Sequence, residues 1–577
     1  MSITGGQAVV EFLKRNDITD VFGMAGHGNL ALLDSFIDSQ INFYSVPHEQ
    51  IAVHAADAYF RIKNKISVVT TTVGPGSTNT VTALADALLD SSAVLLICGG
   101  IPSFYSGKDA LQELGIHNDD EQFEIFKPVT KRIWKVNDIS LLLNSLKRAL
   151  HFAIHGNPGP VMVHVPLDYF SKKYNFNFQN ITVDYKIQNN CSPSDIEKLI
   201  TLINKAKKPA ILAGNGVILS DGAEILTKLS KKINIPVITT MSGQGCIDEN
   251  SANYFGYTGV VGTPSANQIL KETDVLIVIG TKMPEMDCNS WSKDFFLNES
   301  TEIIHVDIDP YQFSKIINSR LQIQSNAKFL LESLYLKHEK INLDIDKRWL
   351  KKINDIKDKW KVSLIKSKDS YESPITVERL LSDINECRDD DTIIVSGVGL
   401  RHAIGQFILF RNPRTNIVGS GFGTMGQEVP AAIGAKIAKP ESTVIAIVGD
   451  GSFRSTMQTL VMAAEYNIPV IWIIQNNYSF NIISLYQNKH WGRKIGTDFK
   501  KNNNLYNPDF VSLAKSFGLN GYKVQNPKNL LKTIKRAISS KKPCVIDVIS
   551  TMTPNIKASG YWAVNDIFSK KWDGNPF

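Results

Sequence analysis

The chain has few cysteines, and they lie far apart. The closest two, Cys246 and Cys288, are separated by 42 positions (288 − 246). This spacing excludes the C-x-x-C pairs of zinc knuckles and the dense disulfide framework of small secreted domains. Widely spaced cysteines suit a reducing compartment, so we expect a cytoplasmic protein.

Long hydrophobic runs and a strong charge excess are also lacking. The longest apolar runs, such as Ala93–Cys98 and Val470–Ile474, fall far short of the roughly 20 residues that a membrane span requires. Residues 1–20 mix acidic and basic side chains and lack the basic-then-apolar order of a signal peptide. The net charge of +7 is spread over the whole length. We therefore expect neither a membrane nor a nucleic acid as partner.

The composition is that of a large globular protein. The 577 residues are 43% hydrophobic and 21% charged, enough to bury several cores. Short β-branched runs alternate with helical stretches, which indicates parallel sheets with helices on both faces. The strands are expected at Ile66–Thr72, Ala93–Cys98, Val161–Val165, Ala210–Ala213, Val275–Ile279, Glu302–Val306, Thr392–Ser396, Val444–Val448, Val470–Gln475 and Cys544–Ile549.

Two polar connectors divide the chain, near Asn175–Ser194 and over Lys337–Ser373. The sequence thus predicts an α/β protein with three doubly wound parallel-sheet domains at 1–180, 190–340 and 370–550, followed by a tail at 551–577. The first and third domains could be related in fold.

Two polar turns follow neighbouring strands of the third predicted domain. Gly449-Asp450-Gly451-Ser452 follows one strand, and Asn476-Asn477 follows the next. Strand ends of a parallel sheet meet at one edge, so Asp450 and Asn477 are candidate oxygen ligands of Mg²⁺. Gly449 and Gly451 would let the backbone approach a diphosphate. Each turn alone is equally typical of a loop without a ligand.

The 27-residue spacing of Asp450 and Asn477, with the motifs around them, resembles the thiamine diphosphate signature. Further matching motifs are Val21-Phe22-Gly23, His48-Glu49-Gln50 before Ala55-Ala56-Asp57-Ala58-Tyr59, Gly74-Pro75-Gly76-Ser77-Thr78-Asn79, and Gly423-Thr424-Met425-Gly426 before Pro430-Ala431-Ala432-Ile433-Gly434. The chain therefore resembles the acetolactate synthase superfamily of thiamine diphosphate enzymes over most of its length. The resemblance implies pyrimidine-binding, central Rossmann-like and diphosphate-binding domains in that order.

The resemblance also assigns roles to single residues. It implies that Glu49 activates the aminopyrimidine ring, that the cofactor bends over Met425, and that Asn79 and Ser452 lie beside it. The metal ligands would be Asp450, Asn477 and the backbone oxygen of Ser479. Without the family, Glu49 is more typical of an ordinary surface carboxylate, and Met425 of a core-filling residue. Since family members place these groups on different subunits, we expect a homodimer or homotetramer.

The middle domain carries its own series of glycine turns. The turns are Gly214-Asn215-Gly216, Thr240-Met241-Ser242-Gly243, Gly259-Val260-Val261-Gly262-Thr263, Gly280-Thr281-Lys282 and Asp307-Ile308-Asp309-Pro310, and each by itself is typical of an ordinary strand end. Their order resembles the FAD-binding domain of acetolactate synthases, so Gly214, Gly216, Thr240 and Asp307 are candidate flavin-binding residues.

Three departures bear on the substrate. Gly280-Thr281-Lys282 lacks an Arg that the family uses for an acceptor carboxylate, and Ser484 and Tyr486 replace a family Arg and Trp. Gly26-His27-Gly28-Asn29 resembles thiamine-dependent hydrolases of cyclic diketones, so His27 is a candidate proton carrier. The alternative for His27 is stabilisation of its own turn.

We expect decarboxylation of a 2-keto acid, with pyruvate the first choice, and ligation of the acyl unit to a carbonyl acceptor. The lost Arg favours an aldehyde or a non-carboxylate ketone as acceptor. The alternatives are a C–C-cleaving hydrolase of a 1,2-diketone and an acetolactate synthase proper. A non-catalytic binding protein is disfavoured because Glu49, Asp450 and Asn477 are all present.

Overall fold

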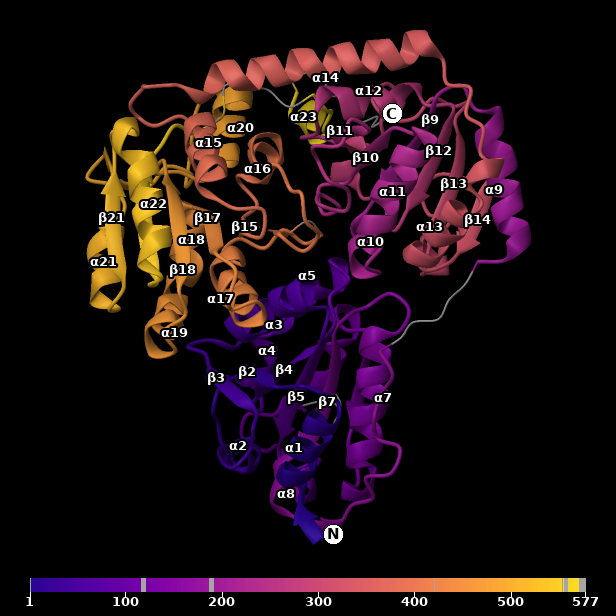
Figure 1. The fold of residues 1–577 in the computed structure, drawn as a ribbon. Helices are drawn as coiled ribbons and strands as arrows, with labels where there is room; N and C mark the ends of the chain where they lie inside the picture. Colours follow the sequence, from indigo (N-terminus) through magenta and orange to yellow (C-terminus); the bar gives the residue numbers. More distant parts are fainter. Residues whose placement is uncertain are drawn as a thin grey trace.

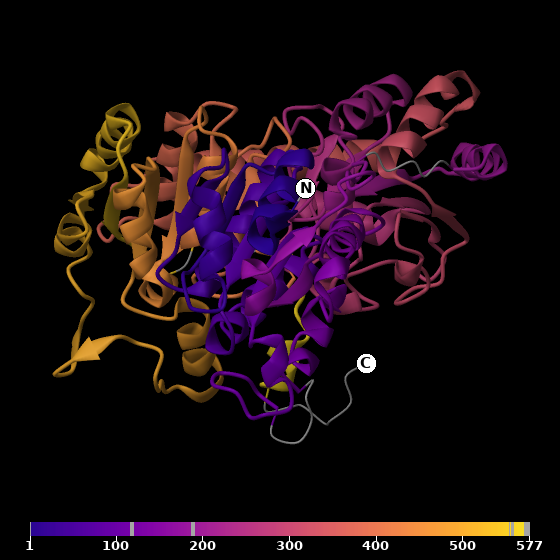
Figure 2. The same ribbon diagram turned by 90° about the horizontal axis from the view of Figure 1, so that it is seen from below.

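The computed structural model describes residues 2–115, 121–185, 191–419, 421–552, 554 and 559–569. Figure 1 shows three sheet-containing units, the first at the bottom and the middle and third side by side above it. Seen from below, the first unit lies in front of the junction between the other two (Figure 2). Within the described residues, no helix is long and apolar enough to span a bilayer.

The first unit begins with a short strand and ends near residue 175. Its strands are β1 (Ser2–Thr4), β2 (Asp20–Gly23), β3 (Asn42–Ser45), β4 (Ser67–Thr71), β5 (Val94–Gly100), β6 (Arg132–Lys135), β7 (Val161–Pro166) and β8 (Lys173–Asn175). Its helices are α1 (Gly5–Arg15), α2 (Leu30–Ile37), α3 (Glu49–Lys63), α4 (Pro75–Thr78), α5 (Val81–Leu89), α6 (Glu121–Glu124), α7 (Leu142–Ile154) and α8 (Leu167–Ser171).

The middle unit is smaller. Its strands are β9 (Pro209–Ala213), β10 (Val237–Thr239), β11 (Tyr254–Tyr257), β12 (Val275–Ile279), β13 (Glu302–Asp307) and β14 (Leu321–Gln324). Its helices are α9 (Pro193–Lys205), α10 (Asn215–Leu219), α11 (Ala223–Ile233), α12 (Pro264–Glu272) and α13 (Ala327–Leu336).

A long helix, α14 (Lys347–Lys368), leads to the third unit. The strands there are β15 (Ile393–Ser396), β16 (Asn416–Val418), β17 (Val444–Gly449), β18 (Val470–Asn476), β19 (Lys500–Lys501), β20 (Asn504–Leu505), β21 (Asn520–Val524) and β22 (Cys544–Ile549). The helices are α15 (Val377–Cys387), α16 (Arg401–Phe407), α17 (Glu428–Ala438), α18 (Asp450–Thr456), α19 (Leu460–Glu465), α20 (Asn481–Trp491), α21 (Phe510–Ser516) and α22 (Leu530–Ser540). The short helix α23 (Val564–Ile567) belongs to the C-terminal tail and lies beside the middle unit (Figure 1).

The three six-stranded sheets are parallel throughout, but only two share a topology. The first runs β3-β2-β4-β5-β7-β6 and the third β16-β15-β17-β18-β22-β21. Numbered within each unit, both orders are 2-1-3-4-6-5, so the first and third units have one topology. The middle sheet, β11-β10-β9-β12-β13-β14, has the order 3-2-1-4-5-6 of nucleotide-binding doubly wound folds. The predicted α/β class with three parallel sheets is confirmed.

The predicted connector over Lys337–Ser373 is largely helical. Asp346 caps α14 by accepting hydrogen bonds from the Arg348 and Trp349 N–H groups. Trp349 and Ile353 are buried in a core shared with the middle unit. Figure 1 shows the helix lying across the tops of the middle and third units.

The first and third units share a core through two helices. Helices α3 and α17 pack so closely that a Cβ at Gly434 would lie 1.9 Å from the backbone oxygen of Ala55. Small residues on α3 and α17, among them Ala52, Ala56 and Ala431, fill this contact. The two units are therefore held together within one chain.

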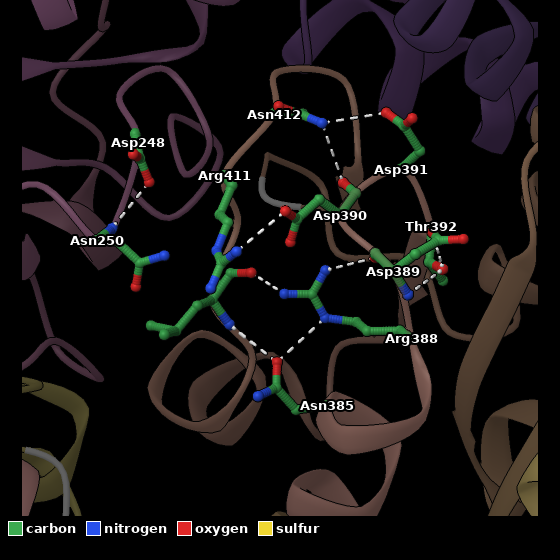
Figure 3. A network of polar contacts seen from close by, with 11 residues as sticks. Asp248, Asn250, Asn385, Arg388, Asp389, Asp390, Asp391, Thr392, Arg411 and Asn412 are labelled. Atoms are coloured by element: carbon green, nitrogen blue, oxygen red, sulfur yellow. Dashed lines mark hydrogen bonds and ion pairs between the residues drawn. The ribbon is translucent and has the colours of Figure 1, made fainter.

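A polar network of the third unit lies where that unit faces Asp248 and Asn250 of the middle unit (Figure 3). Arg411 Nη1 donates to Asp390 Oδ2 at 3.1 Å, and Asn412 Nδ2 donates to Asp391 Oδ1 at 3.1 Å. Arg388 donates to the Leu409 carbonyl oxygen. Across the junction, Glu249 of the middle unit is buried and its Oε2 accepts from the Phe410 N–H at 2.9 Å.

Candidate active site

The third unit positions a carboxylate at the end of β17. Asp450 is the first residue of α18, and its Oδ1 accepts from the Gly451 N–H at 2.9 Å. Its Oδ2 accepts from the Tyr478 N–H at 2.6 Å and from Asn507 Nδ2 at 2.7 Å. Burial raises the pKa of Asp450 to about 6, and these hydrogen bonds oppose the rise. The side chain is thus fixed at the carboxyl edge of the sheet.

Asn477 supplies an unused acceptor beside this carboxylate. It follows β18 and is buried, and within the described residues its Oδ1 has no hydrogen-bond partner. Tyr478 after it has a left-handed backbone (φ 59°), which is uncommon for a bulky residue and concentrates at functional sites. A buried oxygen without a donor favours a cation as its partner.

The donor set suits a magnesium ion that shares its coordination with phosphate oxygens. Ser479 Oγ donates to Thr497 O and Asp498 Oδ1, each at 3.1 Å, so this side chain is already engaged. In the part of the chain that the structure describes, no three His, Cys, Asp or Glu side chains gather as a metal site. One carboxylate, one amide and a backbone carbonyl therefore fit Mg²⁺ with a diphosphate better than an all-protein metal cage.

The two glycines of the Gly-Asp-Gly turn have different surroundings. A Cβ at Gly449 would meet nothing within 4 Å, so this backbone faces open space. A Cβ at Gly451 would lie 2.7 Å from the Phe480 ring, so here the glycine serves packing within the loop. Ser452 follows, buried in the first turn of α18.

Met425 projects from a turn instead of filling the core. Gly423 (φ 73°) and Gly426 (φ 87°) flank it in left-handed conformations, and its side chain is 42% exposed. Thr456 Oγ1 anchors the turn by donating to the Gly426 carbonyl at 2.6 Å. The core-filling alternative for Met425 is wrong.

Glu49 is buried in the first unit. It begins α3, is 6% exposed, and its Oε2 accepts from Asn79 Nδ2 at 2.9 Å. A Cβ at Gly76 would lie 3.4 Å from Glu49 Oε1, so the 74–79 turn lies against this carboxyl group. The surface alternative for Glu49 is wrong, and the structure brings together Glu49 and Asn79.

Within one chain these groups form two separate clusters. The contacts of Glu49 come from the first unit, whereas those of Asp450 come from the third. The described contacts therefore do not join the two halves of the predicted site.

His27 lies on the surface of the first unit, in the turn between β2 and α2. It is exposed and lines a cavity of about 430 Å³ together with Pro102, Tyr105, Lys108 and other residues of the same unit. The turn is held by Asn29, whose Oδ1 accepts from the Gly26 N–H at 3.0 Å. The structure supplies that stabilisation without the His27 ring.

A second cavity of about 430 Å³ opens beside the middle unit. Gly216 and Asp307 line it, and Gly216 crosses Gly280 so closely that a Cβ would lie 2.7 Å from the Gly280 Cα. Burial raises the pKa of Asp307 to about 6. Gly214 packs behind, against the Gly280 carbonyl, and Thr240 is buried with its Oγ1 accepting from the Gly243 N–H at 3.0 Å. Gly214 and Thr240 thus support the cavity without lining it.

Sequence reasoning missed several residues around these sites. Asn507 bonds Asp450 and Asn476, and its only sequence signal is the Asn-Pro turn at 507–508. Glu428 lies against Gly397, where a Cβ would meet its Oε1 at 2.2 Å, and burial raises its pKa to about 7. A glutamate at the start of a helix is ordinarily a first-turn residue that favours the helix dipole, so nothing in the sequence indicates that Glu428 is buried.

Comparison with known proteins covers all three units. Family models described as "Thiamine pyrophosphate enzyme" match residues 3–123 (N-terminal TPP binding domain), 196–334 (central domain) and 398–548 (C-terminal TPP binding domain).

Similar proteins match along nearly the full length. A "Probable acetolactate synthase large subunit" of Methanocaldococcus jannaschii is 33% identical over 557 residues, covering 94% of this chain and 91% of the relative. An "Acetolactate synthase large subunit" of Corynebacterium glutamicum is 32% identical over 560 residues, covering 95% and 87%. One of Lactococcus lactis is 30% identical over 559 residues, covering 96% and 93%.

Proposed function

Because this chain belongs to the thiamine pyrophosphate enzymes, in the acetolactate synthase family, we propose that it decarboxylates a 2-keto acid and joins the remaining acyl unit to a carbonyl compound. Pyruvate is the proposed keto acid. The observation that carries the proposal is the pair of buried clusters at two sheet edges, Glu49 with Asn79 and Asp450 with Asn477. These are the residue types that a thiamine diphosphate ring and its metal-bound diphosphate require.

The two clusters have different tasks. Asp450, Asn477 and the Ser479 carbonyl would hold Mg²⁺ and through it the diphosphate, and Met425 would support the rings. When bound, thiamine diphosphate supplies a nucleophilic carbon and an electron sink for decarboxylation. Glu49, dry and held by Asn79, would hold and move the proton at the aminopyrimidine ring.

A second copy of the chain would complete the site. Glu49 and Asp450 belong to separate clusters. The turn before α17, which would support the cofactor rings, carries two exposed apolar side chains, Phe422 at 55% and Met425 at 42%. An exposed apolar pair beside a cofactor site supports a covering partner. We therefore propose a homodimer as the catalytic unit, with a homotetramer as a further assembly.

The acceptor is proposed to be an aldehyde or a non-carboxylate ketone. Ser484 is buried and donates to Asp498 Oδ1 at 2.7 Å, and Tyr486 packs 5.7 Å from the Trp562 ring, so neither position offers a cation to a carboxylate. Lys108 in the His27 cavity supports the second candidate, an acetolactate synthase with a second keto acid as acceptor. His27 itself supports the third, hydrolysis of a 1,2-diketone.

We also propose FAD in the middle-unit cavity. The strand order 3-2-1-4-5-6, the Gly216–Gly280 crossing and the buried Asp307 support a dinucleotide there. Decarboxylation and ligation do not need the flavin, so its role would be structural. All six cysteines are free, which supports a reducing, cytoplasmic location.

Product analysis by mass spectrometry tests the function. The protein would receive carbon-13 pyruvate alone, with a panel of aldehydes and ketones, and separately a cyclic 1,2-diketone, always with thiamine diphosphate and Mg²⁺. Labelled CO₂ with a labelled ligation product supports the proposal, and the product names the acceptor. Ring opening without CO₂ supports the hydrolase. Cofactor binding without turnover of any of these would overturn the proposal.

A further inference from the structure

The turn that carries Met425 is tied to the first unit by Asp90. Asp90 follows α5 directly and is buried, and its Oδ1 accepts from the Gly421 N–H at 2.9 Å. Its Oδ2 lies 3.6 Å from Arg61 Nη1, and Arg61 Nη2 donates to the Val418 carbonyl at 2.8 Å. Asp90 and Arg61 of the first unit thus hold the backbone at two positions that shortly precede Met425.

The backbone at Gly421 is also held by contact. A Cβ at Gly421 would lie 2.4 Å from the Cβ of Leu89 and 3.2 Å from Asp90 Oδ1. Only glycine lets this segment reach the end of α5. Arg401 Nη1 donates to the Gly419 carbonyl at 2.9 Å from the other side.

The same residues form a wall of the middle-unit cavity. Arg61, Leu89 and Asp90 of the first unit and Gly421 of the third line it together with residues of the middle unit. Among the latter, Lys282 donates from Nζ to the Leu89 carbonyl at 2.8 Å, beside Asp90. The cavity is therefore complete only while all three units meet around Asp90.

A ligand in the cavity contacts this wall in its closed state, with Gly421 on Asp90. Loss of the Gly421–Asp90 hydrogen bond would open the wall at this point and would remove a contact that holds the backbone before Met425. A ligand that binds the closed state better must favour that state, and the linkage is reciprocal.

We propose that Asp90, with Arg61, is a positioning residue that couples the middle-unit cavity to thiamine diphosphate binding. A dinucleotide in the cavity holds the wall closed, keeps Gly421 on Asp90 and so preorganises Met425. The coupling is positive. This inference rests on the proposed function, because it takes thiamine diphosphate and FAD as the two ligands.

The test is a pair of titrations of the apo-protein with Mg²⁺ present. Calorimetry gives the Kd of thiamine diphosphate without and with saturating FAD, and flavin fluorescence gives the Kd of FAD without and with thiamine diphosphate. Coupling between protein sites is typically about 5–150-fold. We expect FAD to lower the thiamine diphosphate Kd by a factor in that range, and thiamine diphosphate to lower the FAD Kd by the same factor.

Two variants separate positioning from general damage. Asp90→Ala removes the acceptor for Gly421, and Gly421→Ala forces a Cβ against Leu89 while leaving every charge in place. Both should bring the coupling factor close to 1, whereas Asp34→Ala, on the exposed face of α2, should keep the parent value. Circular dichroism shows whether each variant folds. If Asp90→Ala or Gly421→Ala does not fold, Arg61→Lys is measured in its place, because the shorter lysine side chain loses the hydrogen bond to the Val418 carbonyl.

The outcomes distinguish the inference from the function. A coupling factor of 1 in the parent protein, an absence of FAD binding, or full coupling in folded Asp90→Ala and Gly421→Ala would each overturn the inference. If thiamine diphosphate does not bind the parent protein at all, the proposed function itself fails.

Discussion

Glu249 should make the stability of this protein fall as the pH rises. It lies at the junction of the middle and third units, where Tyr254 Oη donates to its Oε1 at 3.0 Å and the Phe410 N–H to its Oε2 at 2.9 Å. Burial raises its pKa to about 8 from the ordinary 4.5, against the opposing effect of these hydrogen bonds. The folded protein therefore keeps a proton that the unfolded chain releases above pH 4.5.

The sign and size follow from proton linkage. Because the folded pKa is raised, the protonated carboxyl group contributes its full stability below about pH 4.5, and this contribution is lost as the pH rises to about 8. One proton corresponds to about 1.4 kcal/mol per pH unit, so the loss over this window is on the order of 5 kcal/mol. Glu249→Gln keeps the shape and an acceptor oxygen but cannot ionise, so it escapes this loss.

Melting temperatures of the parent and Glu249→Gln between pH 5 and pH 9 provide the assay. We expect similar melting at pH 5 and a variant that melts increasingly above the parent as the pH rises, with the difference levelling off above about pH 8. Other titrating groups are common to both proteins and cancel in the difference. Glu299→Gln, at an exposed carboxylate, should follow the parent at every pH. Parallel curves for the parent and Glu249→Gln would refute the reasoning.

The remaining predictions concern the cofactors and the packing of the units. Asp450→Ala and Asn477→Ala should each abolish Mg²⁺-dependent binding of thiamine diphosphate in calorimetry, and unchanged affinity would remove the metal-site assignment. Glu49→Gln should bind the cofactor but slow deuterium exchange at its thiazolium C2 by about 10²–10⁴-fold, measured by NMR, and parent-like exchange would exclude Glu49 as the activating acid. The purified protein should be yellow from FAD, and a colourless protein that gains no flavin absorbance on reconstitution would contradict this. Gly434→Ala should destabilise the protein by roughly 1–3 kcal/mol, seen as a lower melting temperature, because its Cβ meets backbone on α3 that cannot move aside.

The sequence predicted the buried strands well because burial on both faces leaves a continuous β-branched run. All ten predicted strands are present within two residues of their expected bounds. Among the missed strands, β3 and β14 are partly exposed at sheet edges, where side chains carry no apolar run. The missed strands β2 and β10 are buried but span only four and three residues, too short for a clear run. The helix α14 was not predicted, because it is rich in charged residues and only two of its residues, Trp349 and Ile353, are buried.

The sequence located Asp450 and Asn477 because each belongs to a short local motif, whereas the residues that hydrogen-bond to the site lie far away in the sequence. Asp450 and Asn477 each directly follow a strand, so the spacing of two turns locates them. Asn507, which binds the Asp450 carboxylate, lies 57 positions away in a loop, and only the folded chain brings it there. The same holds for Asp90 and Gly421, separated by 331 positions.

The shared topology of the first and third units explains where their acids lie, and their surroundings explain why the acids differ. Helix α3 follows the second strand of its six-stranded sheet, as α17 does in the other unit, and these equivalent helices pack on each other. Each begins with a buried glutamate, Glu49 and Glu428. Glu49 receives a hydrogen bond from Asn79, whereas Glu428 lies against Gly397 with both carboxyl oxygens lacking a partner among the described residues, and its pKa rises to about 7. Topology therefore sets the position of an acid at a helix start, while the neighbouring turn decides which hydrogen-bond donors the carboxyl group meets.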